Sequence, residues 1–389
     1  MRSLKLYLAV AVVLIAAVAL TLSPFPRVNA DVPEPASTAM PAPVLKSIGA
    51  LEIGPDGVLF AADSEGAAIY AFEIQHPSVE KPASAGEGRI ETLVEDLDEK
   101  LAALLGTSPR DLAIQDMAVH EPSATTYLSI LRGRDDAAKP VLMSVARDGS
   151  VAEVRLEGVP YTRLALADAP AEDAKLYHWS SRSFTVTDLE LIDGELYVAG
   201  LSNEEFASVL RRVPYPFTDG ISAVGLEIFH GAHGEYETFA PIFSFAPFDI
   251  GGKAHLLAGY LCTPLVTFPL DQVKTKDRLR GKTIAELGWG NIPTDLVPFE
   301  VEGKDYVLVV NNRRGNMVFK GSDIVSAQAR DGITQEAAPR TGLVDHSVAL
   351  GNVVQAATFD RDNVLVLGRS MENGSLSLQA VPTGRLWRG

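Results

Sequence analysis

Hydrophobic residues recur along this chain in short runs separated by polar turns, and the clearest set lies between residues 47 and 74. The pattern predicts a first strand over residues 48–53, followed by a Gly-Pro-Asp-Gly turn in which proline presets the backbone and Asp-Gly supplies the bend. Residues 58–62 are continuously apolar, as expected of a strand buried on both faces, and residues 67–74 form a third strand. Such a hairpin set cannot bury its own faces, so it predicts neighbours of the same kind.

The same order of features returns five more times along the sequence. The predicted first strands begin near residues 48, 112, 184, 243, 293 and 353. Their spacing is close to the length of a four-stranded propeller blade, and radial repetition leaves each sheet only short, protected edges. The pattern therefore predicts an all-β fold: a six-bladed β-propeller of four-stranded antiparallel blades, with seven blades as the alternative.

Two details of the propeller follow from local patterns. We expect five apolar segments to be equivalent, buried second strands, and they cover residues 58–62, 196–199, 256–258, 306–310 and 364–367. The last repeat lacks a clear fourth strand. Residues 41–46 are expected to fill that outer position and so to join the two ends of the chain.

Three segments interrupt the strand pattern. Residues 96–111 predict a short inserted helix, because leucines share one face and Gly106 follows them. Residues 160–183 predict a long connection without a strand. Residues 202–217 predict a loop and helix insertion that begins at a capping residue, Ser202 or Asn203, and stops before Pro214. Long insertions in a compact repeat fold are often functional.

The first 30 residues have the pattern of a Sec-type signal peptide. Arg2 and Lys5 precede an apolar run at 6–22, and small residues end the segment at Ala30. The alternative is an uncleaved membrane anchor, because the apolar run is about long enough to span a bilayer. We therefore expect a cleaved signal peptide at 1–30, a disordered Pro/Ala-rich leader at 31–43 and one propeller domain at 44–389, exported to the periplasm or medium.

The net charge limits the classes of partner. The formal charge is −16, and loss of the three cations in residues 1–30 lowers it to −19. So acidic a surface argues against nucleic acid or anionic lipid as a partner. We expect a monomer that binds a small molecule or a protein.

Cys262 is the only cysteine, which excludes an intramolecular disulfide and a Cys-x-x-Cys-His haem attachment. We expect a buried, inert thiol there. A nucleophilic role would need a base within hydrogen-bond reach, and His178 or His346 could approach only through the fold.

The connections between second and third strands of a propeller open on the same face as the connections between blades. Here they are rich in polar, charged and aromatic side chains, and convergent polar groups at a concave mouth predict a binding site. The alternative is that these loops are polar only because they are solvated. The candidate ligand-binding residues are Asp63, His178, Arg182, Asn203, Glu204, Tyr260, Asn312, Arg313, His346 and Arg369.

Arginines are prominent among these candidates. Arg182, Arg313 and Arg369 would place local positive charge on a strongly acidic protein, and their guanidinium groups suit a carboxylate or another oxyanion. We therefore expect an anionic small molecule or an acidic segment of a partner protein on this face. The alternative is that the arginines pair with neighbouring Asp and Glu side chains.

Three predicted inner strands carry an aspartate at one register, Asp116, Asp188 and Asp295, where the other three carry alanine. Carboxylates converging on the axis could hold a hard cation such as Ca²⁺. The alternative, which we favour, is that each aspartate accepts hydrogen bonds from backbone N–H groups.

A histidine pair provides another candidate metal site. His230 and His233 are followed by Glu235, and such residues can bind zinc. The two intervening glycines instead favour a hairpin turn, and the predicted strand order places it on the opposite face from the loops.

The segment at 54–72, GPDGVLFAADSEGAAIYAF, resembles the blades of NHL-repeat and gluconolactonase-like propellers, and PTDL at 293–296 is a second, weaker match. The resemblance covers the first blade well and the others loosely, without a full set of the lactonase metal ligands. Because the motif is structural, it supports the fold more than an activity.

The sequence thus favours an exported binding propeller. The alternative that the resemblance implies is a calcium-dependent hydrolase of the lactonase type, and a quinone- or haem-linked oxidoreductase is a weaker third.

Overall fold

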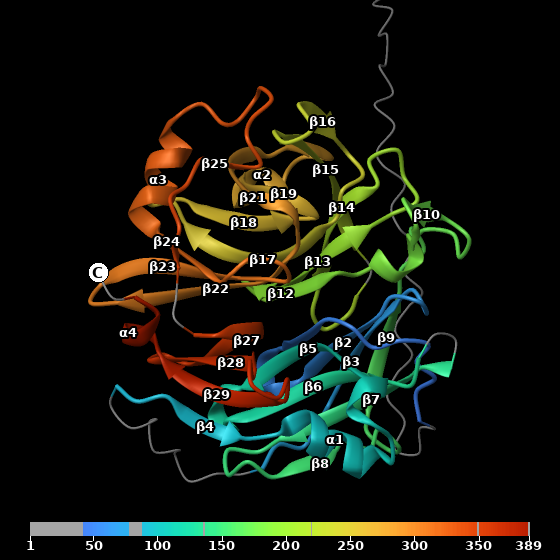
Figure 1. Ribbon diagram of the computed structural model, residues 1–389. Helices are drawn as coiled ribbons and strands as arrows, with labels where there is room; N and C mark the ends of the chain where they lie inside the picture. The colour runs from blue at the N-terminus through green and yellow to red at the C-terminus, as the bar shows by residue number, and fades with distance from the viewer. Residues whose placement is uncertain (1–41, 78–87, 135–136, 219, 348–349, 388–389) are drawn as a thin grey trace, which may run out of the picture.

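The computed structural model describes residues 42–77, 88–134, 137–218, 220–347 and 350–387. Six antiparallel sheets form a closed ring, as the repeat pattern predicts (Figure 1). The predicted signal peptide and most of the predicted leader lie outside the described residues. Among the residues described, no helix combines the length and hydrophobicity needed to cross a membrane.

Each blade is named here by the order in which its inner strand occurs along the chain, and its strands are given from the axis outward. Blade 1 is formed by β1 (Leu51–Ile53), β2 (Leu59–Asp63), β3 (Ala68–Phe72) and β9 (Tyr161–Ala165). Blade 2 is formed by β5 (Leu112–His120), β6 (Thr125–Arg132), β7 (Lys139–Val145) and β8 (Val151–Glu153). Blade 3 is formed by β12 (Asp188–Ile192), β13 (Glu195–Leu201), β14 (Ser208–Pro214) and β15 (Ser222–His230), with β16 (Glu235–Glu237) and β20 (Arg278–Arg280) added to β15.

The other three blades follow the same plan. Blade 4 is formed by β17 (Ile242–Asp249), β18 (Ala254–Tyr260), β19 (Cys262–Pro269), β21 (Lys282–Asn291) and β25 (Arg340–Thr341). Blade 5 is formed by β22 (Pro293–Val301), β23 (Lys304–Asn311), β24 (Met317–Lys320) and β26 (His346–Ser347). Blade 6 is formed by β27 (Asn352–Asp360), β28 (Asn363–Arg369), β29 (Leu376–Pro382) and β4 (Glu91–Val94).

The blades do not follow one another around the axis in chain order. Neighbouring inner strands are β5, β1, β12, β17, β22 and β27, and β27 then meets β5. Blade 2 therefore lies between blade 6 and blade 1. After β3 the chain leaves blade 1 and forms β4, the outer strand of blade 6. It then forms blade 2 and returns as β9, the outer strand of blade 1. Figure 1 shows this closure as the cyan β4 beside the red β29.

The expectation that residues 41–46 close the last blade is therefore wrong. β4 pairs with β29, with Ala380 opposite Glu91 and Leu378 opposite Val94. Arg147, which follows β7, donates two hydrogen bonds of 2.7 and 2.6 Å to the Glu91 carboxylate and so ties β4 to blade 2. A paired guanidinium and carboxylate give the short outer strand a fixed position.

The interruptions of the strand pattern have mixed outcomes. The inserted helix α1 (Leu97–Leu105) is present, and Gly106 ends it in a left-handed conformation with φ of 62°. The helix expected in 202–217 is wrong, because that segment contains the third strand of blade 3, β14. The connection at 160–183 is not free of strands: it contains β9, and also β10 (Lys175–Leu176) paired with β11 (Trp179–Ser180). The remaining helices in the described part are α2 (Leu270–Val273), α3 (Gly321–Ala329) and α4 (Thr383–Leu386).

Apolar packing between the blades holds the ring together. Four of the five segments predicted as second strands lie within β13, β18, β23 and β28, and residues 59–62 of the first segment lie in β2. The side chains of all five segments are buried. Strands covered on both faces need apolar side chains on both faces, which is why these runs are continuous in the sequence. In every blade, the loop between the second and the third strand opens at the same end of the ring. We call this end the loop-rich face.

Candidate functional site

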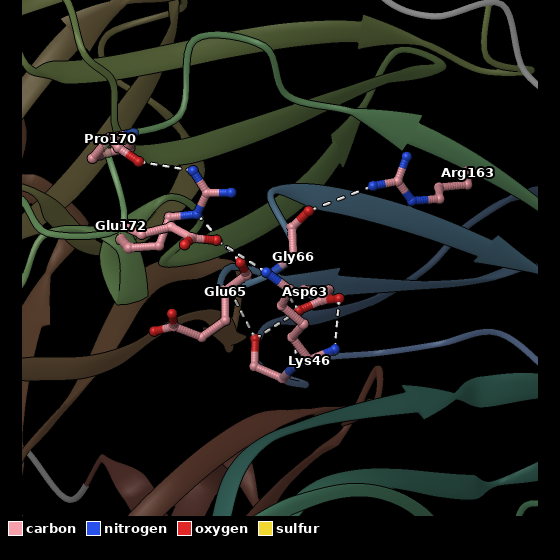
Figure 2. A network of polar contacts seen from close by, with 9 residues as sticks. Lys46, Asp63, Glu65, Gly66, Arg163, Pro170 and Glu172 are labelled. Atoms are coloured by element: carbon pink, nitrogen blue, oxygen red, sulfur yellow. Dashed lines mark hydrogen bonds and ion pairs between the residues drawn. The ribbon is translucent and has the colours of Figure 1, made fainter. Parts of the chain in front are cut away.

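Asp63, the first candidate ligand residue, is 1% exposed and organises a loop of the chain itself. Its carboxylate accepts hydrogen bonds from the backbone N–H groups of Lys46, Ser47 and Gly66, at 3.0, 2.8 and 2.9 Å. Figure 2 shows Asp63 between Lys46 and Gly66. These bonds fix the segment that leads into blade 1 and leave the Asp63 carboxylate turned inward.

Two of the candidate arginines donate to backbone carbonyls. Arg182 donates to Pro170 O at 2.8 Å and to Glu65 O at 3.3 Å, and Arg369 donates to Gly374 O at 2.9 Å. The alternative, pairing with acidic side chains, is not what positions them. Arg182 joins the β2–β3 loop to the segment around Pro170, and Arg369 holds its own loop. Arg313 is therefore the candidate arginine best placed to meet a ligand.

Two other candidates do not lie at the mouth. Tyr260 is fully buried in the core of blades 3 and 4, because it belongs to the second strand β18 rather than to the loop that follows. His346 lies in the outer strand β26, with its ring 4.5 Å from that of Trp387. Trp387 follows β29 and α4, at the end of the ring opposite the loop-rich face.

The remaining candidates are exposed on the loop-rich face. Asn203 and Glu204 lie in the β13–β14 loop, and His178 packs its ring 4.2 Å from that of Trp179. Asn312 is held by the N–H of Ile292, which donates to its side-chain oxygen at 2.8 Å. Arg313 follows Asn312 directly, and its guanidinium lies beside Gly290.

The three axial aspartates line a cavity of about 850 Å³ along the axis of the ring. Asp116 accepts a hydrogen bond from the N–H of Leu51 at 2.7 Å, Asp188 from that of Phe245 at 2.7 Å, and Asp295 from that of Ala356 at 3.2 Å. Each bond crosses to the inner strand of the next blade, and all three run in the same direction around the ring. The backbone-acceptor alternative therefore describes these aspartates, which join the blades in pairs.

Two more carboxylates, Glu52 and Glu190, line the same cavity. Burial raises the pKa of Glu52 to about 8 and that of Asp116 to about 7, and nearby carboxylates add to the effect at Glu52. Burial and neighbouring acids also raise the pKa values of Asp188, Glu190 and Asp295. None of the described residues that line the cavity is Lys, Arg or His. A cavity lined by several carboxyl groups and no cationic side chain among these residues favours the neutral form of the carboxyl groups.

The His230 hairpin lies at the loop-rich face, so the expected location on the opposite face is wrong. Because β14 is the third strand of blade 3, β15 is the fourth and runs toward the loop-rich face. β15 and β16 meet in a turn in which the N–H of Gly234 donates to His230 O at 2.8 Å, and Gly234 has φ of 71°. Gly231 has no room for a side chain, since a Cβ would lie 2.9 Å from a Glu286 carboxylate oxygen.

This turn brings together side chains that are distant in the sequence. We call His230, His233, Glu237 and Cys262 the rim cluster. The Glu237 carboxylate lies 3.0 Å from Nδ1 of His230 and 2.6 Å from Nδ1 of His233. Cys262 contacts the His230 ring, so the base that a reactive thiol requires is His230, and not His178 or His346. Cys262 has φ of 87° and lies at a β-bulge between β19 and β21.

A second layer supports the rim cluster. Nε2 of His230 lies 2.8 Å from Thr263 Oγ1, and the Thr263 hydroxyl donates to Glu286. The other Glu286 oxygen accepts a hydrogen bond from the N–H of Gly231 at 2.7 Å. His230, Glu237, Thr263 and Glu286 are all at least 98% buried, so the arrangement is fixed from below.

The pKa shifts in the rim cluster point to ionised groups. Burial disfavours the charged forms of all three buried members. Hydrogen bonds with Cys262 and Glu237 nevertheless raise the pKa of His230 to about 9. Hydrogen bonds from both histidines lower the pKa of Glu237, and the His230 ring and the N–H of Gly290 lower the pKa of the Cys262 thiol. Opposite charges within hydrogen-bond reach outweigh burial here.

Exposed aromatic side chains flank the rim cluster. Tyr177 is 63% exposed, and its ring lies 6.5 Å from that of Trp179 and 6.4 Å from that of Phe239. Partial burial is the main cause of the raised pKa of Tyr177, and the charges of Glu237 and Cys262 raise it further. Because these charges act on its hydroxyl group, Tyr177 lies near the rim cluster. Trp289, also 63% exposed, is adjacent in sequence to Gly290, whose N–H contacts Cys262.

Sequence reasoning missed the links within this site. Glu52 and Glu190 could have been found, because each lies two residues beyond the axial register position and must face the same side of its strand. His230 and Cys262 are 32 residues apart in the sequence, and they meet because blades 3 and 4 pack against each other. No local signal in the sequence connects them.

Neither a family model nor a curated protein matches this sequence. Among solved structures, the chain is similar to the extracellular domain of a protein classed as a candidate one-component system from B. thetaiotaomicron, with 10% identity and a TM-score of 0.35. That likeness covers 89% of this chain and 40% of the other. A chain of the mitotic checkpoint complex is similar at 11% identity and a TM-score of 0.36, over 98% of this chain and 99% of that one. At these scores neither likeness carries an argument about function, and the fold rests on the strand pairing.

Proposed function

We propose that this protein is a ligand-binding β-propeller whose site is the part of the loop-rich face around the rim cluster. The observation that carries the proposal is the gathering there of four exposed aromatic side chains from three separate segments, Tyr177, Trp179, Phe239 and Trp289. The Tyr177 ring contacts those of Trp179 and Phe239, and Trp289 is exposed beside Gly290. Such exposed rings leave apolar area in water, which a bound ligand would cover.

The proposed ligand has a flat or apolar body and an anionic group. The apolar body is suited to the aromatic rings, which offer contact area at low cost in side-chain entropy. The anionic group is suited to Arg313 and to Arg314, whose side chain donates to Trp289 O at 3.1 Å. Planar guanidinium groups bind carboxylates and other oxyanions through two parallel hydrogen bonds. A small molecule and an acidic segment of a protein share this chemistry.

The calcium-dependent hydrolase alternative has less support. The groups of three potential metal ligands within 4.8 Å of one another, among the described residues, lie at the rim and not on the axis. The axial aspartates already accept hydrogen bonds from the backbone. A calcium-dependent rise in the melting temperature that the Asp188→Asn variant abolishes would favour the hydrolase instead.

Export and the monomeric state remain predictions. Sequencing of the N-terminus of the mature protein tests cleavage after Ala30, and an intact Met1 in a membrane fraction would contradict it. The elution volume in size-exclusion chromatography tests the monomer.

An aromatic anion provides the direct test of the binding site. We expect 8-anilinonaphthalene-1-sulfonate to bind the folded protein at one saturable site, and Trp289→Ala and Tyr177→Ala each to weaken binding about tenfold. Arg313→Ala should weaken the binding of this anion more than the binding of its neutral analogue N-phenyl-1-naphthylamine.

The matched control is Arg369→Ala. Arg369 is an exposed arginine of the same face that donates to its own loop in blade 6, and its replacement should leave binding unchanged. Unchanged binding of the probe by both aromatic variants would overturn the proposed site.

A further inference from the structure

The rim cluster contains a set of metal-ligating atoms that the proposed binding site does not use. One ring nitrogen of His230, one ring nitrogen of His233 and Sγ of Cys262 all lie within 4.8 Å of one another. The three residues come from β15, from the β15–β16 turn and from the start of β19. Two imidazoles and one thiolate are ligands that zinc and copper prefer, whereas calcium and magnesium prefer oxygen.

Glu237 positions both histidines as an outer-sphere residue of a metal site would. Its carboxylate oxygen Oε1 lies within hydrogen-bond distance of both rings, 3.0 Å from Nδ1 of His230 and 2.6 Å from Nδ1 of His233. A metal-bound histidine usually donates its second ring N–H to a carboxylate, which fixes the tautomer and the orientation of the ring. With both Nδ1 atoms held by Glu237, the Nε2 atoms are the ligand atoms of the two rings. Nε2 of His230 would exchange its 2.8 Å contact with Thr263 Oγ1 for the ion.

The stacking of the two rings is better explained by a shared ion than by a catalytic triad. The His230 and His233 rings lie 3.7 Å apart at an angle of 36°. A Cys-His-Glu triad needs Cys262, His230 and Glu237 only, and gives His233 no role. The N–H of Gly290 already contacts Sγ of Cys262 and so is not free to stabilise an oxyanion.

The surroundings meet the other requirements of a metal site. His230 and Glu237 are 1% and 2% exposed, which makes the base of the site rigid. The His233 side chain is 34% exposed and Cys262 is half-buried, so an ion has access from the loop-rich face. Three protein ligands leave a fourth position open for water or for another ligand.

We propose that His230, His233 and Cys262 bind one transition metal ion, Zn²⁺ or Cu²⁺, with Glu237 orienting the two imidazoles from the outer sphere. The metal site stands on these donor atoms alone and does not depend on the ligand proposed for the neighbouring aromatic side chains. If both sites are occupied, the open coordination position faces the same region of the loop-rich face as Tyr177 and Trp289.

The test is a metal titration of the full chain after removal of metals with a chelator. We expect one equivalent of Zn²⁺ to bind and to raise the melting temperature, while Ca²⁺ leaves it unchanged. Co²⁺ should give the absorption of a tetrahedral site with a thiolate-to-cobalt charge-transfer band. If the site selects copper, Cu²⁺ should bind more tightly than Zn²⁺ and give an intense visible thiolate band. If the site selects zinc, Zn²⁺ should bind more tightly than Cu²⁺, in a complex without visible absorption.

Variants separate this site from adventitious binding. Cys262→Ser should abolish the charge-transfer band, and His233→Gln and Glu237→Gln should each weaken Zn²⁺ binding about 10- to 100-fold. His178→Gln is the matched control, since it removes an exposed histidine of the same face outside the donor set. His233 is partly exposed, so its variant should fold, as circular dichroism can verify.

Protection of the thiol gives a second readout. Cys262 is the only cysteine, and Zn²⁺ should slow its alkylation by iodoacetamide in the wild-type protein. Failure to bind any of the three transition metals would overturn the proposal. Equal Zn²⁺ affinity in the wild type, Cys262→Ser and His233→Gln would likewise overturn it, because an adventitious ion only is then bound.

Discussion

Two glutamates of this propeller, Glu190 in the axial cavity and Glu237 at the rim, experience opposite environments. Glu190 faces the axial cavity, where burial and the carboxylates of Glu52 and Asp116 raise its pKa. Burial also opposes ionisation of Glu237, yet the imidazoles of His230 and His233 lower its pKa. The difference lies in the partners, since burial by itself raises the pKa of both side chains.

The comparison shows how one acidic protein supports two kinds of polar interior. On the axis, carboxyl groups that can remain protonated accept backbone hydrogen bonds and join neighbouring blades. At the rim, ionised groups of opposite sign are held together at a surface that an ion or a ligand can reach. Perturbed pKa values occur in both regions, but among the described residues the rim combines them with imidazole and thiol donors and with exposed aromatic side chains.

The strongest test of this difference is to remove each charge in turn. Glu237→Gln should lower the free energy of unfolding by about 3 kcal/mol at pH 7 in metal-free buffer, because it breaks a buried ion pair. Glu190→Gln should leave the free energy of unfolding unchanged or raise it, because it removes a source of repulsion. Denaturation by urea measures both values.

Glu235→Gln controls for a charge change at the surface of the same hairpin and should alter stability by less than about 0.5 kcal/mol. Equal losses of stability in Glu190→Gln and Glu237→Gln would show that the two environments do not differ.

A smaller effect is expected when an axial hydrogen bond between blades is removed. Asp188→Ala leaves the N–H of Phe245 without its partner and should cost about 2 kcal/mol. Asp188→Asn keeps an acceptor oxygen and should cost less. If the asparagine variant loses as much stability as the alanine variant in urea denaturation, the charge of Asp188 matters more than its hydrogen bond.

The axial carboxyl groups should also make stability depend on pH. The raised pKa values of Asp116 and Glu52, about 7 and about 8, mean that the folded protein retains protons that the unfolded chain has lost above pH 5. The free energy of unfolding should therefore fall between pH 5 and 6, by up to about 1.4 kcal/mol per pH unit for each retained proton. His230 contributes little in this interval, because it is protonated in the folded and unfolded chain alike.

Glu52→Gln is the control for this slope. Replacing the carboxyl group should make the decline with pH shallower, as urea denaturation at each pH would show. A free energy of unfolding that rises from pH 5 to 6 in the wild-type protein would contradict the assignment of neutral carboxyl groups to the axis.

The sequence predicted the blades because burial on both faces forces continuous apolar runs. The missed elements break that rule. β14 contains Arg211, which is fully buried and donates to Asp168 at 2.8 Å, a partner 43 residues away. An arginine in the middle of a strand gives no apolar signal, and only the folded chain supplies its counter-ion.

The missed strand also explains the error about the histidines. Successive antiparallel strands alternate in direction, so omitting β14 reversed the inferred direction of β15 and moved His230 to the wrong face. The aspartate register on the axis was visible in the sequence because it repeats in three blades. The rim cluster occurs once and joins two blades, so no repetition reveals it.

The placement of β4 has a consequence for the order of synthesis. Thr92 of β4 pairs with Gln379 of β29, 287 residues further along the chain. β4 must therefore wait until β29 has left the ribosome before its sheet is complete. Blade 1 likewise waits for β9, which follows all of blade 2. Folding one blade at a time during synthesis would leave both edges unpaired, so this ring is expected to close late and as a single cooperative unit.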